Sequence, residues 1–529
     1  MKISDSDMNM KIVDQKLFDD LMRERTLLLL SLARKIVMDG AEKMQLTRPL
    51  LGNIQGEATQ LEELLDSYGA RNNSQWYVFR IQIAALKNFS TAGYELLHLK
   101  HTSLGYRLDT TQEGFLAGTE DALNYVAAFL FCSLNRLLAE TKAFGWPPPE
   151  DNLGLDFSEI LPGGRLPRDR KTKDDKSAQE LVIRLATEFL NNTEDAKFLQ
   201  VAARTQGPKW KNLNFDRIGE ASIRAMEGKL HNLQSTYDTY VCDSETEACD
   251  PNLPKLRGHI SIVLHILRVA TIFAHFYERH LKINTDALRC CNHTCVLSGD
   301  WFLNLFTHYL CRYSYEFLHS ARSLCQTMLK KYAVISTIDV PIPPFFGFHA
   351  RPSALVSSIV QHYGSQVTLI CGNSEYDAEK TFELFRVNGW IDQQKRSYIY
   401  HELDALDLQE IEEKIRKHSI SRDEGVLSII RQLALKNMIH ILLYPLPIAP
   451  MIENSHDTLR ELAKNVIIKL HAQRALTILF DIKIKFRGDI RVLNDLRVLA
   501  ENTYGENESG TNIALPRALN YLKHFREQE

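Results

Sequence analysis

The residues best suited to chemistry lie between Gly347 and Pro352, where the chain reads Gly-Phe-His-Ala-Arg-Pro. Proline is favoured in the first turn of a helix, because the N–H that it lacks would have no intrahelical acceptor there. We therefore expect His349 at a helix N-terminus, beside backbone N–H groups and the positive end of the helix dipole. A neutral imidazole is nucleophilic, and it becomes a good leaving group once it is phosphorylated. The pattern predicts reversible phosphorylation of His349, with the N–H of Ala350 and the guanidinium of Arg351 stabilising the phosphate.

Alternating strand-like and helix-like segments must position this motif. Runs rich in Val, Ile and Tyr predict strands, and apolar residues at helical spacing predict helices. The expected strands are Ala333–Val340, Gln366–Cys371 and Ser397–His401, and the expected helices are Ser353–Tyr363 and Leu408–His418.

The stretch Gly347–Ala354 resembles the signature of the histidine-containing phosphocarrier protein (HPr) family of the sugar phosphotransferase system. That signature reads Gly, aliphatic, His, small, Arg, Pro, small, small, and only Phe348 departs from it. The family's element order is strand-helix-strand-strand-helix-strand-helix, and the resemblance covers residues 333–421. It implies an open-faced α+β sandwich that carries phosphate on His349 without a cofactor, rather than a turnover enzyme. It also implies phosphoenolpyruvate as the phosphate source, an Enzyme I-like donor, and an acceptor or regulated protein that the sequence does not identify.

Three residues of the segment that resembles the family's second helix qualify this expectation. Apolar residues there dock Enzyme I in the family, but Glu383 and Arg386 are charged and would weaken such docking. Thr381 aligns with a serine that can receive regulatory phosphate, although a helix N-cap is the more ordinary interpretation. The alternative function is therefore a degenerate HPr fold that serves as a binding scaffold without phosphorylation of His349.

Several groups of residues have the types that bind metals. The pairs Glu95/His98 and Glu316/His319 have the Glu-x-x-His spacing of di-iron helical bundles, but the bridging carboxylates of such a site are not identifiable. Ligands are also concentrated at Cys290, Cys291, His293 and Cys295, with His259 or His280 available to complete a site. Adjacent ligands span a zinc tetrahedron poorly. We expect no metal, and a helical-bundle metalloenzyme is the second alternative.

Composition excludes some classes of function. The chain has 529 residues and a formal net charge of -3, which predicts no general attraction to nucleic acid. The charged run Arg165–Lys176 lacks interleaved aromatic residues and is expected to be a solvated linker. The apolar segments Thr26–Ala33 and Ile260–Phe276 are expected to be buried helices rather than membrane spans. Without a secretory signal at the N-terminus, the nine cysteines are expected to be free thiols in the cytoplasm.

The chain is expected to form several domains. Helical periodicity predicts a bundle over 1–145 and further helices over 177–332, which can form one domain with the first bundle, while residues 146–176 form a linker or long loop. The fold class is therefore an all-α N-terminal region followed by the HPr-like module, 333–421, and an α+β C-terminal unit, 422–529. In that last unit, strands are expected at Ile439–Tyr444 and Ala475–Phe486, and helices at Glu424–Lys436, Ser455–His471 and Ile490–Glu501.

Overall fold

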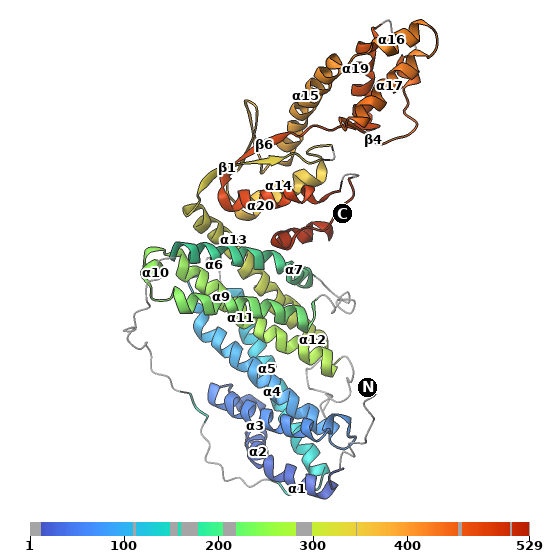
Figure 1. Cartoon of the computed structure of the whole chain (residues 1–529). Coiled ribbons are helices and arrows are strands. Elements are labelled where there is room, and N and C mark those ends of the chain that lie inside the picture. Colours follow the sequence, from blue (N-terminus) through green and yellow to red (C-terminus); the bar gives the residue numbers. More distant parts are fainter. Residues whose placement is uncertain are drawn as a thin grey trace, which may run out of the picture. The chain divides into compact units, whose positions relative to one another are not determined.

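The computed structural model divides the chain into two compact units, Met1–Met328 and Leu329–Glu529 (Figure 1). It describes residues 12–108, 113–148, 157–159, 178–204, 218–281, 299–344, 346–452, 457–507 and 510–527. The division between the units lies close to the expected change from helical to mixed structure. The charged run Arg165–Lys176 lies outside the described residues.

Among its described residues, the first unit contains helices, turns and loops but no strand. Its α-helices are α1 (Gln15–Arg25), α2 (Leu27–Asp39), α3 (Arg48–Ser67), α4 (Tyr77–Thr102), α5 (Glu113–Ala143), α6 (Ala178–Asp195), α7 (Lys197–Arg204), α9 (Glu220–Tyr240), α10 (Glu245–Cys249), α11 (Asn252–Phe276), α12 (Gly299–Asn304) and α13 (Arg312–Lys331), the last of which continues into the second unit. Short 3-10 turns follow at Ala41–Lys43, Ala70–Asn72 and Ser103–Gly105, and π-helical turns at Tyr277–Leu281 and Leu305–Cys311.

The helix α4 is central to this unit, because it packs against α3, α5 and α11. Aromatic side chains fill the space between these helices, where the rings of Phe89 and Phe129 stack with their centroids 3.8 Å apart. The start of α3 follows ordinary capping chemistry, since the Thr47 hydroxyl accepts a hydrogen bond from the N–H of Leu50 and Pro49 occupies the first turn. Burial of aromatic and aliphatic side chains thus stabilises this bundle.

Among the helices that the structure describes, α5 and α11 are long and apolar enough to cross a membrane. In α5, 50% of the most apolar window is buried inside the protein, and in α11 the share is 78%. The core helices of a water-soluble protein combine length, apolar composition and burial in the same way. The expected burial of Ile260–Phe276 is confirmed, since this segment lies within α11 and most of its side chains are buried.

The second unit combines helices with two small sheets. Its strands are β1 (Ile335–Pro341), β2 (Thr368–Cys371), β3 (Ser374–Asp377), β4 (Ile439–Ile441), β5 (Leu476–Ile478) and β6 (Lys483–Asp489). Its helices are α14 (Ala350–Tyr363), α15 (Thr381–Ala405), α16 (Gln409–Arg416), α17 (Arg422–Leu435), α18 (Ala449–Ile452), α19 (Leu459–Ala472) and α20 (Ile490–Glu501), with 3-10 turns at Thr503–Gly505 and Arg517–Glu527.

The larger sheet is antiparallel, with the strand order β1-β6-β2-β3. Phe486 of β6 lies opposite Ile338 of β1 on one side and Leu369 of β2 on the other, and all three side chains are buried. The helices α14 and α20 pack against each other, and α20 also packs against β1 and β6 (Figure 1). The result is a sheet with helices that bury the alternate, apolar side chains of its strands.

Several expectations for this region are wrong in detail. Residues Ser397–His401 are not a strand but part of α15, and the expected strand Ala475–Phe486 is divided between β5 and β6, which belong to different sheets. In chain order, the fourth strand of the larger sheet is therefore β6 and not Ser397–His401. The module expected at 333–421 takes part of its sheet from beyond residue 421, so the expected boundary between 421 and 422 does not coincide with a structural one.

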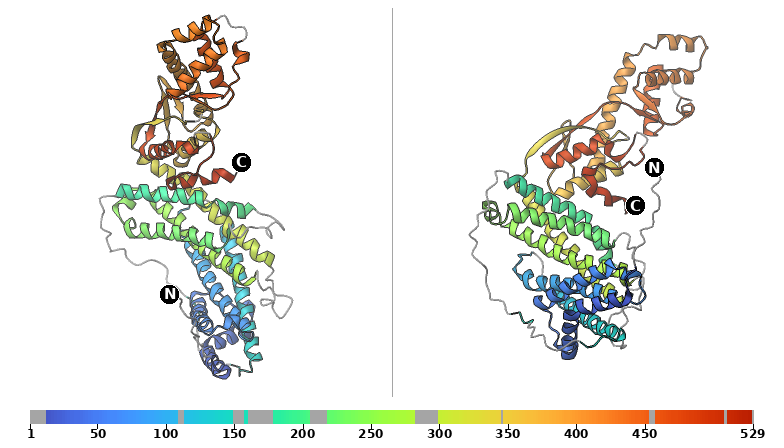
Figure 2. Two further views of the ribbon diagram at one scale, coloured as in Figure 1. Left: turned by 45° about the vertical axis from the view of Figure 1, so that its right-hand side comes forward. Right: turned by 60° about the horizontal axis from the view of Figure 1, so that its bottom comes forward.

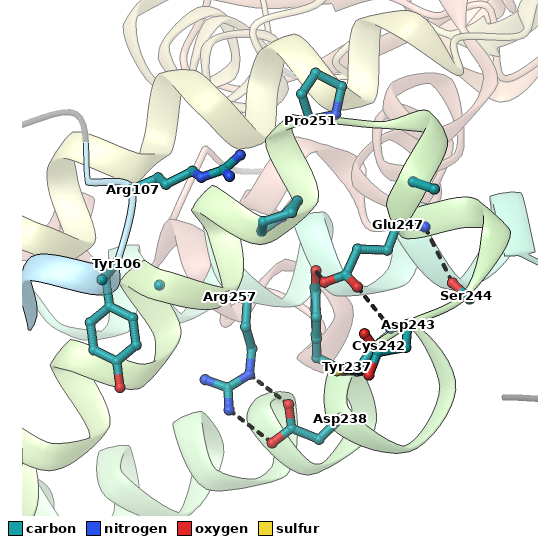
Figure 3. Close-up of a pocket in the computed structure, with 14 residues that line it drawn as sticks. Tyr106, Arg107, Tyr237, Asp238, Cys242, Asp243, Ser244, Glu247, Pro251 and Arg257 are labelled. Atoms are coloured by element: carbon teal, nitrogen blue, oxygen red, sulfur yellow. Dashed lines mark hydrogen bonds and ion pairs between the residues drawn. The ribbon is translucent and has the colours of Figure 1, made fainter. Parts of the chain in front are cut away.

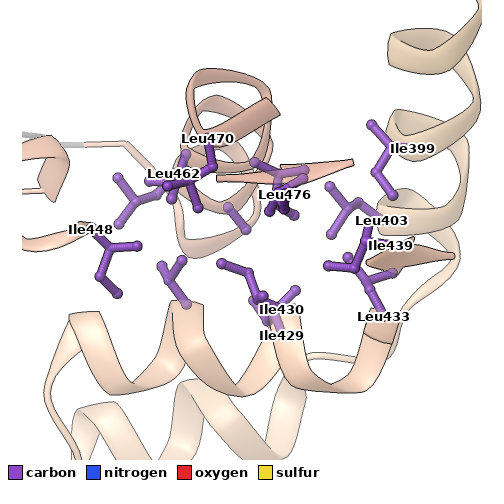
Figure 4. Packing of buried hydrophobic residues seen from close by; sticks show 14 of the residues in the cluster. Ile399, Leu403, Ile429, Ile430, Leu433, Ile439, Ile448, Leu462, Leu470 and Leu476 are labelled. Carbon is purple, nitrogen blue, oxygen red and sulfur yellow. The ribbon is translucent and has the colours of Figure 1, made fainter. Parts of the chain in front are cut away.

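The residues between the middle of α15 and β6 form a cluster of their own. The second half of α15, then α16, α17, α18 and α19 and the β4–β5 pair surround a buried aliphatic core that includes Leu403, Ile430 and Leu470 (Figure 4). Two of its helices begin with complete capping boxes, Ser421 with Glu424 in α17 and Thr458 with Glu461 in α19. The helix α15 contacts β3 and α14 as well as α19. One long helix therefore joins this cluster to the larger sheet, which contains β1 (Figure 2).

Candidate functional site

His349 lies where the sequence predicts, at the N-terminus of a helix that follows a strand and a glycine turn. It is the N-cap residue of α14, with an extended backbone, and its carbonyl accepts a hydrogen bond of 3.1 Å from the N–H of Ser353. Its side chain is 30% exposed. The imidazole is therefore accessible to a reaction partner while its backbone is fixed by the helix.

The loop that carries His349 is held by Asn388 of α15. The Asn388 side chain accepts a hydrogen bond of 2.8 Å from the N–H of Phe348 and donates one of 3.0 Å to the carbonyl of Phe348. Gly347 adopts a left-handed φ of +67°, and a Cβ there would lie 2.4 Å from Asn388 Oδ1. Only glycine fits this combination of backbone conformation and close approach. The glycine of the motif therefore lets a side chain of α15 bind the turn directly.

A segment that follows α20 contacts the side chains of both His349 and Arg351. Glu506 is buried, and its Oε1 lies 3.0 Å from Nε2 of His349. Arg351 donates a hydrogen bond of 3.2 Å from Nε to the carbonyl of Gly505. The other ring nitrogen of His349, Nδ1, lies 3.1 Å from the carbonyl oxygen of Gly347. Sequence reasoning missed Glu506, because it lies 157 residues from His349 and no local motif marks it.

The residues expected on a docking helix lie in the first turns of α15. Lys380 is the N-cap, and Thr381 is the first helical residue, so Thr381 does not cap the helix. The Glu383 carboxylate accepts a hydrogen bond of 2.7 Å from the N–H of Asp377. Arg386 is exposed, and Phe382 beside it is 82% exposed. This turn thus presents an aromatic ring as well as the charge that the sequence predicted to weaken apolar docking.

One of the two Glu-x-x-His pairs belongs to a charge network in the first unit. Glu95 and His98 of α4 meet His265 of α11, whose Nδ1 lies 2.5 Å from Glu95 Oε2, and Arg268 is 3.3 Å from the other carboxylate oxygen. The rings of His98 and His265 are 4.0 Å apart. Burial opposes ionisation of Glu95, but the hydrogen bond from His265 and the nearby positive charges lower its pKa below the ordinary value. Burial and the charge of His265 lower the pKa of His98 to about 4.

The other candidate ligands do not assemble in the described part of the chain. Glu316 forms an ion pair with Arg312, and His319 stacks on Tyr315, within the same helix. His259 is buried, with Nδ1 3.0 Å from the carbonyl of Phe317. The remaining candidate ligands, Cys290, Cys291, His293 and Cys295, lie outside the described residues. Neither Glu-x-x-His pair therefore gives support to a di-iron site.

The cysteines only partly follow the expectation of free thiols. The thiols of Cys242, Cys249, Cys311, Cys325 and Cys371 form no disulfide, whereas Cys132 is disulfide-bonded.

The first unit also contains an open cavity of about 880 Å³ next to α9, α10 and α11 (Figure 3). Among the described residues, the one group with metal-ligand spacing lies on its wall and consists of Cys242, Asp243 and Glu247. Both carboxylate oxygens of Glu247 already accept hydrogen bonds, from the Tyr237 hydroxyl at 2.6 Å and from the N–H of Asp243 at 2.7 Å. Because these hydrogen bonds already use both carboxylate oxygens of Glu247, the three residues do not form a defined ligand site in the cavity wall.

Comparison with known proteins identifies no relative. No family model matches the sequence, and no curated protein and no solved structure gives a significant match. The geometry around His349 is therefore the basis on which a function can be assigned.

Proposed function

We propose that this chain is a phosphocarrier or regulatory protein of a phosphotransferase-type system, reversibly phosphorylated on His349. Phosphate would come from phosphoenolpyruvate through an Enzyme I-like donor and pass to an acceptor protein. The N–H of Ala350 and the guanidinium of Arg351 would stabilise the phosphate. The helical first unit would be the sensing or interaction region to which phosphorylation is coupled, and the protein would act in the cytoplasm.

The position of His349 is the observation that carries this proposal. A partly exposed imidazole at the start of α14, with an arginine two residues later, combines a nucleophile with the groups that bind phosphate. The order of elements adds support. If the residues between the middle of α15 and β6 are an insertion, the chain reads β1, α14, β2, β3, α15, β6, α20, which is the strand and helix order of the HPr family.

The alternative, an HPr-like scaffold that is never phosphorylated, is favoured by a specific observation. The segment after α20 already occupies Nε2 of His349 through Glu506 and Nε of Arg351 through Gly505. On this alternative, the two contacts are structural and tie the C-terminal segment to the start of α14. The two functions differ in whether His349 accepts a phosphoryl group.

The test is incubation of the purified full chain with phosphoenolpyruvate and Enzyme I, followed by measurement of acid-labile phosphate. We expect label on the wild type and none on the His349→Ala variant. His401→Ala is the matched control, because His401 is a strongly exposed histidine of the same unit and should keep the label. An unlabelled wild type would contradict the proposal and favour the scaffold.

A further inference from the structure

The buried face of α15 contains one basic residue in an otherwise aliphatic row. Ile391, Ile399 and Leu403 of this helix are buried and recur at helical spacing. Lys395 occupies the position between Ile391 and Ile399 on the same face, and it is 4% exposed. Figure 4 shows Ile399 and Leu403 pointing from this helix into the aliphatic cluster. A lysine therefore lies where the packing of α15 would otherwise place an aliphatic side chain.

The amine of Lys395 has no partner within the described part of the chain. It forms neither a hydrogen bond nor an ion pair with any described residue, although the charge of Asp392, one turn earlier in α15, acts on it. Its nitrogen is not completely enclosed by other atoms. Among the lysines that the structure describes, it is the only one that is buried. Buried charged groups are nearly always paired, so an unpaired buried amine indicates a chemical role.

The surroundings of Lys395 favour the neutral form of its amine. Burial lowers the pKa of Lys395, and the negative charge of Asp392 reverses that effect only in part. His471 of α19 is the other titratable group here, with Nε2 3.8 Å from Oδ1 of Asp392. A neutral amine is the form that attacks a carbonyl carbon, and lysines that form Schiff bases are activated by desolvation in this way. At neutral pH, a larger fraction of Lys395 than of an exposed lysine is therefore nucleophilic.

We propose that Lys395 is a covalent binding site for a small uncharged aldehyde, which it holds as an imine. The Nζ lone pair forms a bond to the carbonyl carbon, and the carbonyl oxygen takes a proton from the nitrogen to give a carbinolamine. The hydroxyl then leaves as water with the C–O electron pair and a proton from solvent, while the nitrogen lone pair forms the C=N bond of a protonated imine. The carboxylate of Asp392 stabilises the positive charge of this product. The inference is independent of the phosphorylation of His349.

The size and charge of the aldehyde follow from the same surroundings. The low exposure of Lys395 leaves a narrow approach to its nitrogen, which excludes bulky reagents. The aliphatic neighbours Ile391 and Ile399 disfavour any charged group, and the carboxylate of Asp392 repels an anionic one in particular. A carbonyl compound that carries a carboxylate is therefore expected to react poorly at this position.

The test compares acetaldehyde with glyoxylate, a small aldehyde that carries a carboxylate, on the full chain at about pH 7. Sodium cyanoborohydride reduces each imine to a stable secondary amine, and peptide mass spectrometry measures the rate of labelling at each lysine. We expect acetaldehyde to label Lys395 several-fold faster than the exposed Lys436, and glyoxylate to label Lys436 faster. Labelling of Lys395 by acetaldehyde that is no faster than that of Lys436, or the same preference with both aldehydes, would overturn the inference.

A pair of variants tests the role of charge. Asp392→Asn removes the repelling charge and should increase labelling of Lys395 by glyoxylate more than labelling by acetaldehyde. Glu412→Gln removes a negative charge at an exposed position of α16 and should change neither rate. Equal increases with both aldehydes in Asp392→Asn, or equal effects of the two variants, would contradict the proposed selection against anions.

The pH dependence of labelling provides a separate readout in the wild type. An ordinary lysine stays protonated up to about pH 10, so its neutral fraction rises about tenfold for each unit between about pH 7 and about pH 9. The neutral fraction of Lys395 should rise less steeply because burial lowers its pKa. The ratio of acetaldehyde labelling at Lys395 to that at Lys436 should therefore fall as the pH rises, and a constant ratio would contradict the inference.

Discussion

The contact between Asn388 and the turn before His349 predicts strongly non-additive effects of substitution. Asn388→Ala removes two hydrogen bonds to the backbone of Phe348 and should cost about 2 kcal/mol in the local free energy of opening. Gly347→Ala places a Cβ in a left-handed conformation, which costs about 1 kcal/mol by itself. Its Cβ would also meet Asn388 Oδ1 at 2.4 Å and displace that side chain, so the same two hydrogen bonds are lost. Gly347→Ala alone should therefore lower the local free energy of opening by about 3 kcal/mol.

The double variant tests this reasoning. Because Asn388→Ala removes the atom with which the new Cβ collides, the double variant should cost about 3 kcal/mol, whereas independent effects would give about 5 kcal/mol. Native-state hydrogen exchange of peptides from β1 and α14 measures the opening free energy of this region without requiring the whole chain to unfold in one step. Additive costs, or a Gly347→Ala variant as stable as the wild type, would refute the reasoning.

The neighbouring Gly389 provides the control. It is an exposed glycine within α15, and a Cβ there would meet nothing within 4 Å. Gly389→Ala should leave the opening free energy of β1 and α14 unchanged or raise it slightly through better helix propensity. Equal destabilisation by Gly347→Ala and Gly389→Ala would mean that α15 tolerates no substitution in this region, and that Asn388 has no special role.

Three further predictions concern charge. Breaking the buried pair with Glu95→Gln should lower the free energy of unfolding by about 3 kcal/mol at pH 7. Because the pKa of Glu95 in the folded protein is lowered from 4.5, this difference between the wild type and the variant should disappear in an acid-denaturation series as the pH falls below 4.5 through the folded-state pKa. Burial raises the pKa of Asp495 above 3.8 despite hydrogen bonds from Tyr521 and Tyr363. The urea-unfolding free energy of Asp495→Asn should therefore increase relative to that of the wild type as the pH rises from 3.8 through the raised pKa. A difference in unfolding free energy that stays constant over this pH range would contradict the prediction. Arg386→Leu should speed phosphorylation by Enzyme I several-fold and leave labelling by phosphoramidate unchanged, and equal changes with both donors would show that the helix is not a docking site.

Local sequence signals were sufficient for several helices of the second unit and for the position of His349. The helices α14, α17, α19 and α20 all lie close to their predicted ranges, because each has a clear apolar period and several have strong caps. The prediction failed at Ser397–His401, where Tyr and Ile favour a strand in isolation. There, Lys395, Ile399 and Leu403 are buried at helical spacing in α15, and packing against the aliphatic cluster outweighs the local propensity.

The non-local parts of the fold and site could not be predicted in this way. The strand β6 completes the β1 sheet from more than a hundred residues further along the chain, and no period or turn signal reveals which strand becomes its neighbour. The same holds for Glu506 beside His349 and for His265 beside Glu95. A lone glutamate after a helix resembles any solvated residue until the fold brings it to an imidazole.

The most direct test of the central claim is to map the phosphate on the full chain after reaction with phosphoenolpyruvate and Enzyme I. Fragmentation mass spectrometry at neutral pH should find the phosphate on His349, and brief mild acid should remove it. Phosphate that survives acid on a hydroxyl such as that of Thr381, or no phosphate on His349 at all, would contradict the account.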